Sequence, residues 1–265
     1  MPNFLFIDGS YFCFYRYYAL LTWWKNSHSN EPPPENTSLN EEFVSKFKKV
    51  FNLKIDEISK KLKIKDPIII IGKDCHRKNI WRNSIYDEYK ENRNTDNLFM
   101  EGEFFKIAYN ELYPNNTKIK QIINHSSLEA DDCIAVATKY VLDKYSHANI
   151  YIITSDMDYL QLANEHTHIY NLKYKKLTDS KNSFNDCKKD LFCKIVMGDK
   201  SDNIPGIFKK CGIKTAQKLY DDPDLFIKKL NQENSTKDYE RNKQLVDFNQ
   251  LPLNYVNELK TTFNF

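Results

Sequence analysis

Residues 150–158 are Ile150-Tyr151-Ile152-Ile153-Thr154-Ser155-Asp156-Met157-Asp158, an apolar run that ends in two carboxylates. A continuous apolar run of this length is typical of a strand that is covered by helices on both faces. The acids follow the run directly, so we expect them at the carboxyl end of the strand. In open parallel sheets, ligands bind beyond that end. The stretch therefore predicts a buried parallel strand with an acidic ligand site.

Similar apolar runs occur at residues 4–7 and 68–71, and a weaker one at 119–123. The segments that separate these runs have helical periodicity, at residues 11–21, 41–62, 103–112 and 130–142. Strands that alternate with helices indicate a parallel sheet with helices on its faces. We therefore expect an α/β fold with a mostly parallel central sheet.

Acidic residues follow each predicted strand, and two more occur in the later part of the chain. Carboxylates that crowd one sheet edge raise one another's pKa unless a cation neutralises them, so either metal binds there or the strands are wrongly assigned. No His or Cys joins the acids, and ligands made only of hard oxygens favour Mg²⁺. The nine candidate metal ligands are Asp8, Asp74, Glu129, Asp131, Asp132, Asp156, Asp158, Asp199 and Asp202.

The charge distribution points to a phosphate polymer as partner. The formal net charge is only +3, but if nine of the 36 Asp and Glu share one site, the remaining surface is basic. Lysine doublets such as Lys209-Lys210 then suit a nucleic acid that approaches metal ions, although a single doublet is also typical of a solvated helix face.

The cysteines and the apolar runs indicate where the protein resides. Six cysteines show no CxxC spacing, which predicts reduced thiols rather than a zinc or disulfide framework. We find no signal peptide and no apolar run of membrane-spanning length, so we expect a cytoplasmic or nuclear protein that is not associated with membranes.

The organisation changes in the second half of the chain. Residues 167–177 predict a short strand or hairpin, and from residue 187 the chain has helical patterns interrupted near 200–212, at Pro223 and at Pro252. We therefore expect a core at residues 1–185 and a helical subdomain at 186–265. Residues 22–40, which include Pro32-Pro33-Pro34, predict a loop.

The most specific segment is Gly198-Asp199-Lys200-Ser201-Asp202-Asn203-Ile204-Pro205-Gly206-Ile207, followed by Gly212-Ile213-Lys214-Thr215-Ala216. It predicts an acidic loop and two glycine turns, with a helix that begins at about Lys214. The free N–H groups of a helix N-terminus bind anions, and two helices joined in this way can grip a duplex backbone without reading bases.

This segment resembles the GDxSDNxPGI…GxKTA signature of the five-prime nuclease superfamily, which includes flap endonucleases, the five-prime nuclease domain of bacterial DNA polymerase I and the RNase H of T-even phages. Other motifs of the family precede this segment, in the order in which the family has them. They are Phe6-Ile7-Asp8-Gly9, Gly72-Lys73-Asp74, Trp81-Arg82 with residues 86–93, Glu129-Ala130-Asp131-Asp132, and residues 154–162.

The resemblance implies a PIN-like core with an arch at about residues 75–102 and a C-terminal helix-hairpin-helix. It implies that Lys90 contacts the scissile phosphate with support from Arg93. It also implies two Mg²⁺ ions, replaceable by Mn²⁺, the first held mainly by the acids up to Asp132 and the second by the later four. The implied contacts to DNA are made by Arg82, Gly206, Lys209, Lys210, Gly212, Lys214 and Thr215.

One departure concerns the hairpin, because Lys210 stands where the family has a glycine. The family's K⁺ site at the hairpin therefore stays an open expectation, while the lysines still favour phosphate binding.

We therefore expect a structure-specific 5′ nuclease, a 5′-3′ exonuclease or flap endonuclease of replication or repair. It would hydrolyse branched or nicked DNA, or RNA primers in an RNA–DNA hybrid, by a two-metal mechanism. We expect a monomer of the free-standing phage or viral type, with replication proteins as candidate partners. Two alternatives remain: a non-catalytic branched-DNA-binding protein, which would lack some of the acids, and a DxD phosphatase, which leaves the hairpin and Lys90 unexplained.

Overall fold

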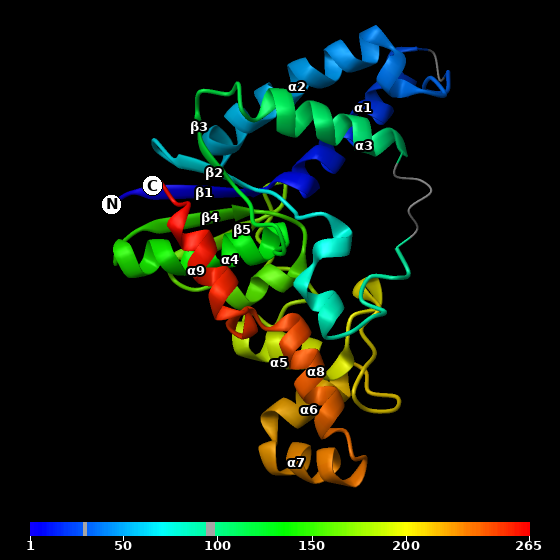
Figure 1. Ribbon diagram of the computed structural model, residues 1–265, viewed down its shortest axis with the longest axis vertical. Helices are drawn as coiled ribbons and strands as arrows, with labels where there is room; N and C mark the ends of the chain where they lie inside the picture. Colours follow the sequence, from blue (N-terminus) through cyan, green and yellow to red (C-terminus); the bar gives the residue numbers. More distant parts are fainter. Residues whose placement is uncertain (29–30, 94–98) are drawn as a thin grey trace.

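A five-stranded parallel sheet lies at the centre of the computed structural model, which describes residues 1–28, 31–93 and 99–265 (Figure 1). The strand order is β3-β2-β1-β4-β5, and every neighbouring pair is parallel. This arrangement confirms the predicted α/β fold. The strands are β1 (Asn3–Asp8), β2 (Ile68–Gly72), β3 (Ile119–Ile123), β4 (Asn149–Ile153) and β5 (Thr167–Tyr170).

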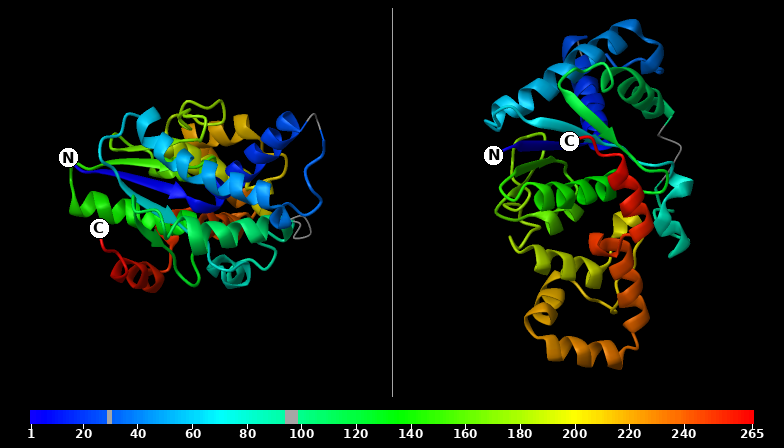
Figure 2. Two further views of the ribbon diagram at one scale, coloured as in Figure 1. Left: turned by 90° about the horizontal axis from the view of Figure 1, so that it is seen from above. Right: turned by 60° about the vertical axis from the view of Figure 1, so that its left-hand side comes forward.

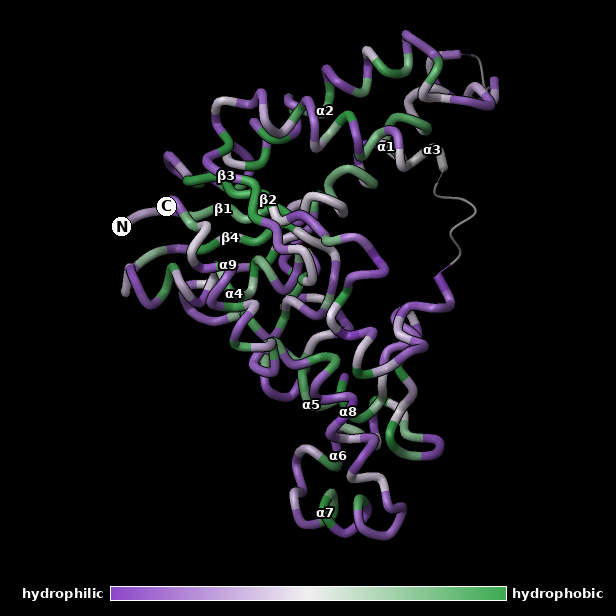
Figure 3. Tube along the Cα trace, viewed as in Figure 1, coloured by the Kyte–Doolittle hydropathy of each residue, from purple (hydrophilic) through white to green (hydrophobic). Residues whose placement is uncertain are grey.

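Alternate residues of each strand enter two different cores, because successive side chains point to opposite faces of a sheet. Leu5 and Ile7 of β1 pack with α1 (Gly9–Ser27), α2 (Glu41–Lys61) and α3 (Phe99–Ile107). Phe4 and Phe6 face the other way, toward α4 (Ala130–Lys144) and α9 (Leu253–Thr261). The two layers of helices lie above and below the sheet in Figure 1 and in the right view of Figure 2. Burial on both faces explains why the strands are apolar without alternation (Figure 3).

The helix α1 is longer than its pattern predicted, because it continues through the first part of the expected loop to Ser27. Trp24 is buried near its end, stacks on the His28 ring at 3.8 Å and packs against Phe43 of α2. Packing against α2 thus extends the helix beyond the point where its local sequence ceased to favour one. The predicted helix at 103–112 begins earlier, at Phe99, and ends in a π-helical turn, Ala108–Leu112.

The helical part beyond the sheet consists of α5 (Cys187–Met197), α6 (Ile213–Asp221), α7 (Pro223–Gln232) and α8 (Thr236–Val246). These helices extend away from the sheet, and α9 then returns to it (Figure 1). Leu259 and Phe265 join the core that contains Phe4, so the end of the chain packs with the first strand. The boundary at residue 186 stays a prediction. In the described part of the chain no helix is both long and apolar enough to cross a membrane.

Candidate active site

The carboxyl ends of β1 and β4 bring Asp8 close to the loop that carries Asp156. The chain passes from β1 to β2 and β3 on one side and resumes at β4 on the other, so this is the topological switch point where open α/β sheets bind ligands. Asp8 caps α1 by accepting the Tyr11 N–H at 3.0 Å. Thr154 and Tyr159 donate their hydroxyls to its second oxygen at 3.4 and 3.3 Å.

Asp74 lies two residues beyond β2 and joins the same edge. Its carboxylate accepts the Ser10 hydroxyl and, at 2.8 Å, the backbone N–H of Ala130 at the start of α4. Gly9 permits this close approach, because a Cβ there would lie 2.7 Å from the Gly72 carbonyl oxygen. The ends of β1 and β2 and the start of α4 are thereby held against one another.

The N-cap and the first turn of α4 supply the three acids Glu129, Asp131 and Asp132, and one carboxylate oxygen of each lies within 4.8 Å of the others. Asp132 accepts the Glu129 N–H at 3.2 Å in a capping box that fixes the start of the helix. We call these three residues the first acid cluster.

Arg82 is buried beneath the first acid cluster, and this corrects its predicted role as a DNA contact. Its side chain donates to both Asp132 oxygens at 2.7 Å, to Glu129 at 3.0 Å and to the Leu245 carbonyl at 2.7 Å. Trp81 donates to Asp132 as well, at 3.1 Å. Because Arg82 is only 2% exposed and Asp132 is fully buried, we assign both to the support of the site.

Lys90 lies between the sheet edge and the helical part. Its ammonium is 2.6 Å from Glu129 and 3.5 Å from Asp202, and its backbone N–H donates to the Asp202 carbonyl at 2.9 Å. Arg93 forms an ion pair with Asp202, and Arg77 donates to the carbonyl oxygen of Lys90, whose φ of 58° lies in the left-handed region. The structure thus brings both predicted catalytic residues to the acids. Residues 94–98 of the predicted arch lie outside the described residues.

A second acid cluster is formed by Asp158, Asp199 and Asp202, again with carboxylate oxygens that can lie within 4.8 Å of one another. Asp199 and Ile204 exchange two backbone hydrogen bonds that close the acidic loop, at 2.8 and 2.7 Å. Gly198, at φ 73°, is required before it, because a Cβ would lie 2.3 Å from the Ile204 carbonyl oxygen. Lys194 of α5 forms ion pairs with Asp158 and Asp199.

The protonation of the acids indicates that the site fits divalent cations. Burial, followed by the charges of Asp74 and Asp156, raises the pKa of Asp8 to about 7. Burial also raises the pKa values of Asp74 and Asp131. Crowded carboxylates repel one another, and a bound cation removes this repulsion. Because they offer only oxygen ligands, they suit Mg²⁺ or a similar hard ion.

Comparison with known proteins agrees with this geometry. Residues 3–189 match the family model described as the 5′-3′ exonuclease N-terminal resolvase-like domain. The chain belongs to the 5′-3′ exonuclease family. This confirms the predicted family, and it favours the nuclease interpretation over both alternatives.

Two relatives show the extent of the match. A 5′-3′ exonuclease of Buchnera aphidicola (Schizaphis graminum) is 31% identical over 219 residues, which cover 80% of this chain and 67% of the relative. That of Bacillus subtilis is 31% identical over 164 residues, which cover 57% and 52%. The chain therefore spans about half to two thirds of these relatives' length.

Solved structures share the fold across nearly the whole chain. The phage T5 D15 protein co-crystallised with metal ions has a TM-score of 0.68 at 16% identity and covers 98% of this chain and 97% of its own. A complex of the T5 D15 flap endonuclease with DNA and metal ions has a TM-score of 0.66 at 17% identity, with the same coverage.

The raised pKa of Asp8 predicts that the stability of the protein depends on pH. Between the unfolded value of 3.8 and the folded value of about 7, the folded protein keeps a proton that the unfolded chain has released. This stabilisation is complete below pH 3.8 and is lost as the pH rises through 7. In EDTA we expect the melting temperature to fall between about pH 5 and 8, and Mg²⁺ to restore it at pH 8. Asp8→Asn should flatten the fall, whereas a melting temperature that rises over this range in EDTA would contradict the assignment.

The predicted hairpin residues lie on the exposed surface of the helical part. Gly206 ends the acidic loop, and Gly212 caps α6. Lys210, at the position where the family has glycine, adopts a left-handed conformation with φ 55°. A glycine adopts this conformation without the strain that a side chain introduces. The exposed candidates for contact with DNA are Gly206, Lys209, Lys210, Gly212, Lys214 and Thr215.

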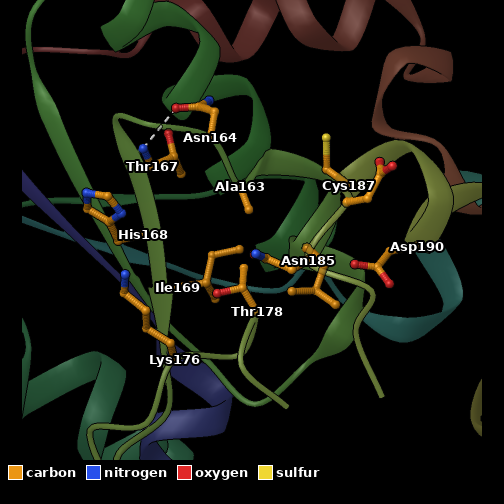
Figure 4. Close-up of a pocket in the computed structure, with 12 residues that line it drawn as sticks. Ala163, Asn164, Thr167, His168, Ile169, Lys176, Thr178, Asn185, Cys187 and Asp190 are labelled. Atoms are coloured by element: carbon orange, nitrogen blue, oxygen red, sulfur yellow. Dashed lines mark hydrogen bonds between the residues drawn. The ribbon is translucent and has the colours of Figure 1, made fainter. Parts of the chain in front are cut away.

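The pocket in Figure 4 lies away from the exonuclease-family acids. It has a volume of about 250 Å³ and opens between β5 and the start of α5, beside His168, Lys176 and Asp190. None of the nine predicted metal ligands lines it. We therefore assign it no part in the site.

Sequence reasoning missed Lys194 and the buried partners Trp81 and Tyr89. The hydroxyl of Tyr89 lies 3.0 Å from Glu129 and 3.2 Å from Asp202, so it links the two acid clusters. A tyrosine within the motif at residues 86–93 could have suggested such a role. Lys194 lies in α5, which contains none of the nine predicted metal ligands, and nothing in its local pattern distinguished it from a solvated lysine.

Proposed function

We propose that this chain is a metal-dependent 5′ nuclease that hydrolyses phosphodiester bonds in branched or nicked DNA. The observation that carries the proposal is the meeting of the two acid clusters on either side of Lys90, beside an exposed hairpin. Relatives named 5′-3′ exonucleases support this activity, although the chain matches only part of their length.

We assign the metal ligands according to the two clusters. Asp8, Asp74, Glu129 and Asp131 would hold the first ion, with Asp132 in support, and Asp156, Asp158, Asp199 and Asp202 would hold the second. Mg²⁺ is the proposed ion, and Mn²⁺ would substitute for it. Bound divalent ions would lower the pKa of a water molecule and stabilise the leaving oxygen.

The side chains of the chain itself position the substrate. Lys90 has a cationic group beside both clusters, where it can contact the scissile phosphate and stabilise its developing charge, with Arg93 alongside. The N-terminus of α6 and its neighbouring lysines would hold the duplex backbone without reading bases. Asp202 belongs to both regions, since its backbone lies in the acidic loop that precedes the hairpin. Placement of the substrate and chemistry are therefore coupled.

The finer assignments belong to the same proposal. The substrates would be 5′ flaps, nicks and primer–template junctions, with RNA–DNA hybrids as a further candidate. We propose a monomer that works in replication or repair, with replication proteins as partners. A K⁺ ion at the hairpin would have to bind beside the charged side chain of Lys210, which stands where the resemblance implies a glycine.

Cleavage of a panel of substrates tests the proposal. The protein is incubated in Mg²⁺ with 5′-labelled flap, nicked and RNA-primed duplexes, and separately with a small phosphate monoester. We expect the nucleic acids to be cut near their 5′ ends and the monoester to persist. A hydrolysed monoester beside intact flaps would indicate a phosphatase, and tight binding of flaps without cleavage would indicate a non-catalytic junction-binding protein.

Replacement of Lys90 by alanine separates catalysis from binding. We expect Lys90→Ala to lower kcat on the order of 100-fold, because its ammonium faces the reacting phosphate, and to weaken DNA binding only slightly. Lys209→Ala, in the exposed hairpin, should instead weaken binding in a salt-dependent way and leave kcat at saturating DNA nearly unchanged. Single-turnover rates and binding titrations distinguish the two. Loss of binding with an unchanged kcat in Lys90→Ala would refute its catalytic role.

A further inference from the structure

The ammonium of Lys194 lies against two carboxylates of the second acid cluster, which are proposed ligands of the second metal ion. Its ammonium lies 2.7 Å from Asp199 and forms a second ion pair with Asp158. The side chain is 20% exposed, and those of Asp158 and Asp199 are 12% and 16% exposed. The ion pairs are thus largely shielded from water, where attraction between opposite charges is stronger than at an open surface.

Asp199 has hydrogen-bond donors besides Lys194. Ser201 donates its backbone N–H at 2.7 Å and its hydroxyl at 2.6 Å to the Asp199 carboxylate. Asp202, the third member, is paired with Arg93 and Lys90 instead. Lys194 is thus the counter-ion of the two remaining carboxylates.

A divalent ion held by Asp158 and Asp199 must replace this ammonium, because two cations cannot share those oxygens without strong repulsion. Resting on the proposed function, we propose that Lys194 is a resident cation that sets the affinity of the second metal site. In the absence of metal it keeps the cluster assembled. When metal binds it competes, so the second ion binds more weakly than the carboxylates alone would allow.

The structure offers the displaced ammonium another partner. Asp190 lies four residues earlier in α5, the spacing at which side chains of one helix face meet. Both residues line a hollow of about 240 Å³ that also contacts Asp199. Lys194 can therefore turn from the acid cluster toward Asp190 without leaving the protein surface.

Titration with Mn²⁺ in the absence of DNA tests the proposal. Binding is followed by isothermal titration calorimetry in the full chain, in Lys194→Met and in the control Lys188→Met, which removes the same charge from an exposed position of α5. We expect the second Mn²⁺ to bind at least about tenfold more tightly in Lys194→Met, and the control to match the wild type. Lys194→Arg keeps the cation and should retain the weak second site.

Melting temperatures provide the second readout. In EDTA, Lys194→Met should melt below the wild type, because its carboxylates have lost their counter-ion, and Mn²⁺ should stabilise it more than the wild type. If Lys194→Met does not fold, Lys194→Gln takes its place. An unchanged or weaker second site in a folded variant overturns the role of Lys194. Failure of the wild type to bind any Mn²⁺ contradicts the proposed function instead.

Discussion

Asp156→Asn is expected to reduce cleavage of a 5′ flap on the order of 1,000-fold while DNA binding and stability stay close to the wild type. Asp156 is exposed at the carboxyl end of β4, and its charge helps to raise the pKa of Asp8. Its local structural task is to accept the Asp158 N–H at 2.9 Å, which an asparagine oxygen can also do. The substitution therefore removes a charge from the proposed metal site and little else.

Three measurements separate this outcome from a general loss of structure. Single-turnover rates in Mg²⁺ report on catalysis, binding titrations in EDTA report on DNA affinity, and thermal unfolding reports on the fold. Asp179→Asn serves as the control, because it removes the charge of an exposed aspartate outside the site. Wild-type rates in a folded Asp156→Asn variant would exclude Asp156 from the metal site.

Arg82→Met is expected to lower the free energy of unfolding by about 3–5 kcal/mol, because it leaves the buried Asp132 without its cation and leaves Glu129 with Lys90 alone. Lys118→Met is the control. Its ion pair with Asp56 is exposed to solvent, so we expect a loss of less than about 1 kcal/mol. Denaturant unfolding of the two variants checks the difference.

A double variant identifies the cause of the loss. If unpaired buried charge is responsible, Arg82→Met combined with Asp132→Leu should recover part of the stability, since an apolar pair can replace a buried ion pair at little cost. A double variant less stable than Arg82→Met alone would show that other contacts of Arg82 matter more. A near-neutral Arg82→Met would contradict the account of Arg82 as the support of the first acid cluster.

The fold could be predicted from its sequence because burial on both faces leaves a plain signal. The runs before Asp8, Asp74 and Asp156 are apolar without alternation. Each run ends at the last residue of a strand or one residue before it. The acids of the sheet edge follow from that assignment. The prediction that Asp199 and Asp202 belong to the site depended on the family signature. Their position near the sheet edge results from tertiary packing, which no local sequence pattern shows.

The corrected assignments concern residues whose environment is decided by distant parts of the chain. Arg82 is indistinguishable in sequence from an exposed phosphate-binding arginine, and only packing against α4 and Leu245 shows that it is buried. Lys194 is similar, since its partners Asp158 and Asp199 come from other elements. The extension of α1 likewise follows from contact between Trp24 and Phe43.

The central claim is that the protein cleaves DNA only when divalent metal ions are bound at the acid clusters. The most direct measurement is the cleavage of a 5′-labelled flap by the wild-type protein at equal ionic strength in Mg²⁺ and in EDTA. We predict cleavage near the 5′ end in Mg²⁺ and no product in EDTA, with activity restored when Mg²⁺ is added in excess of the chelator. Cleavage that persists at the same rate in EDTA would contradict the claim.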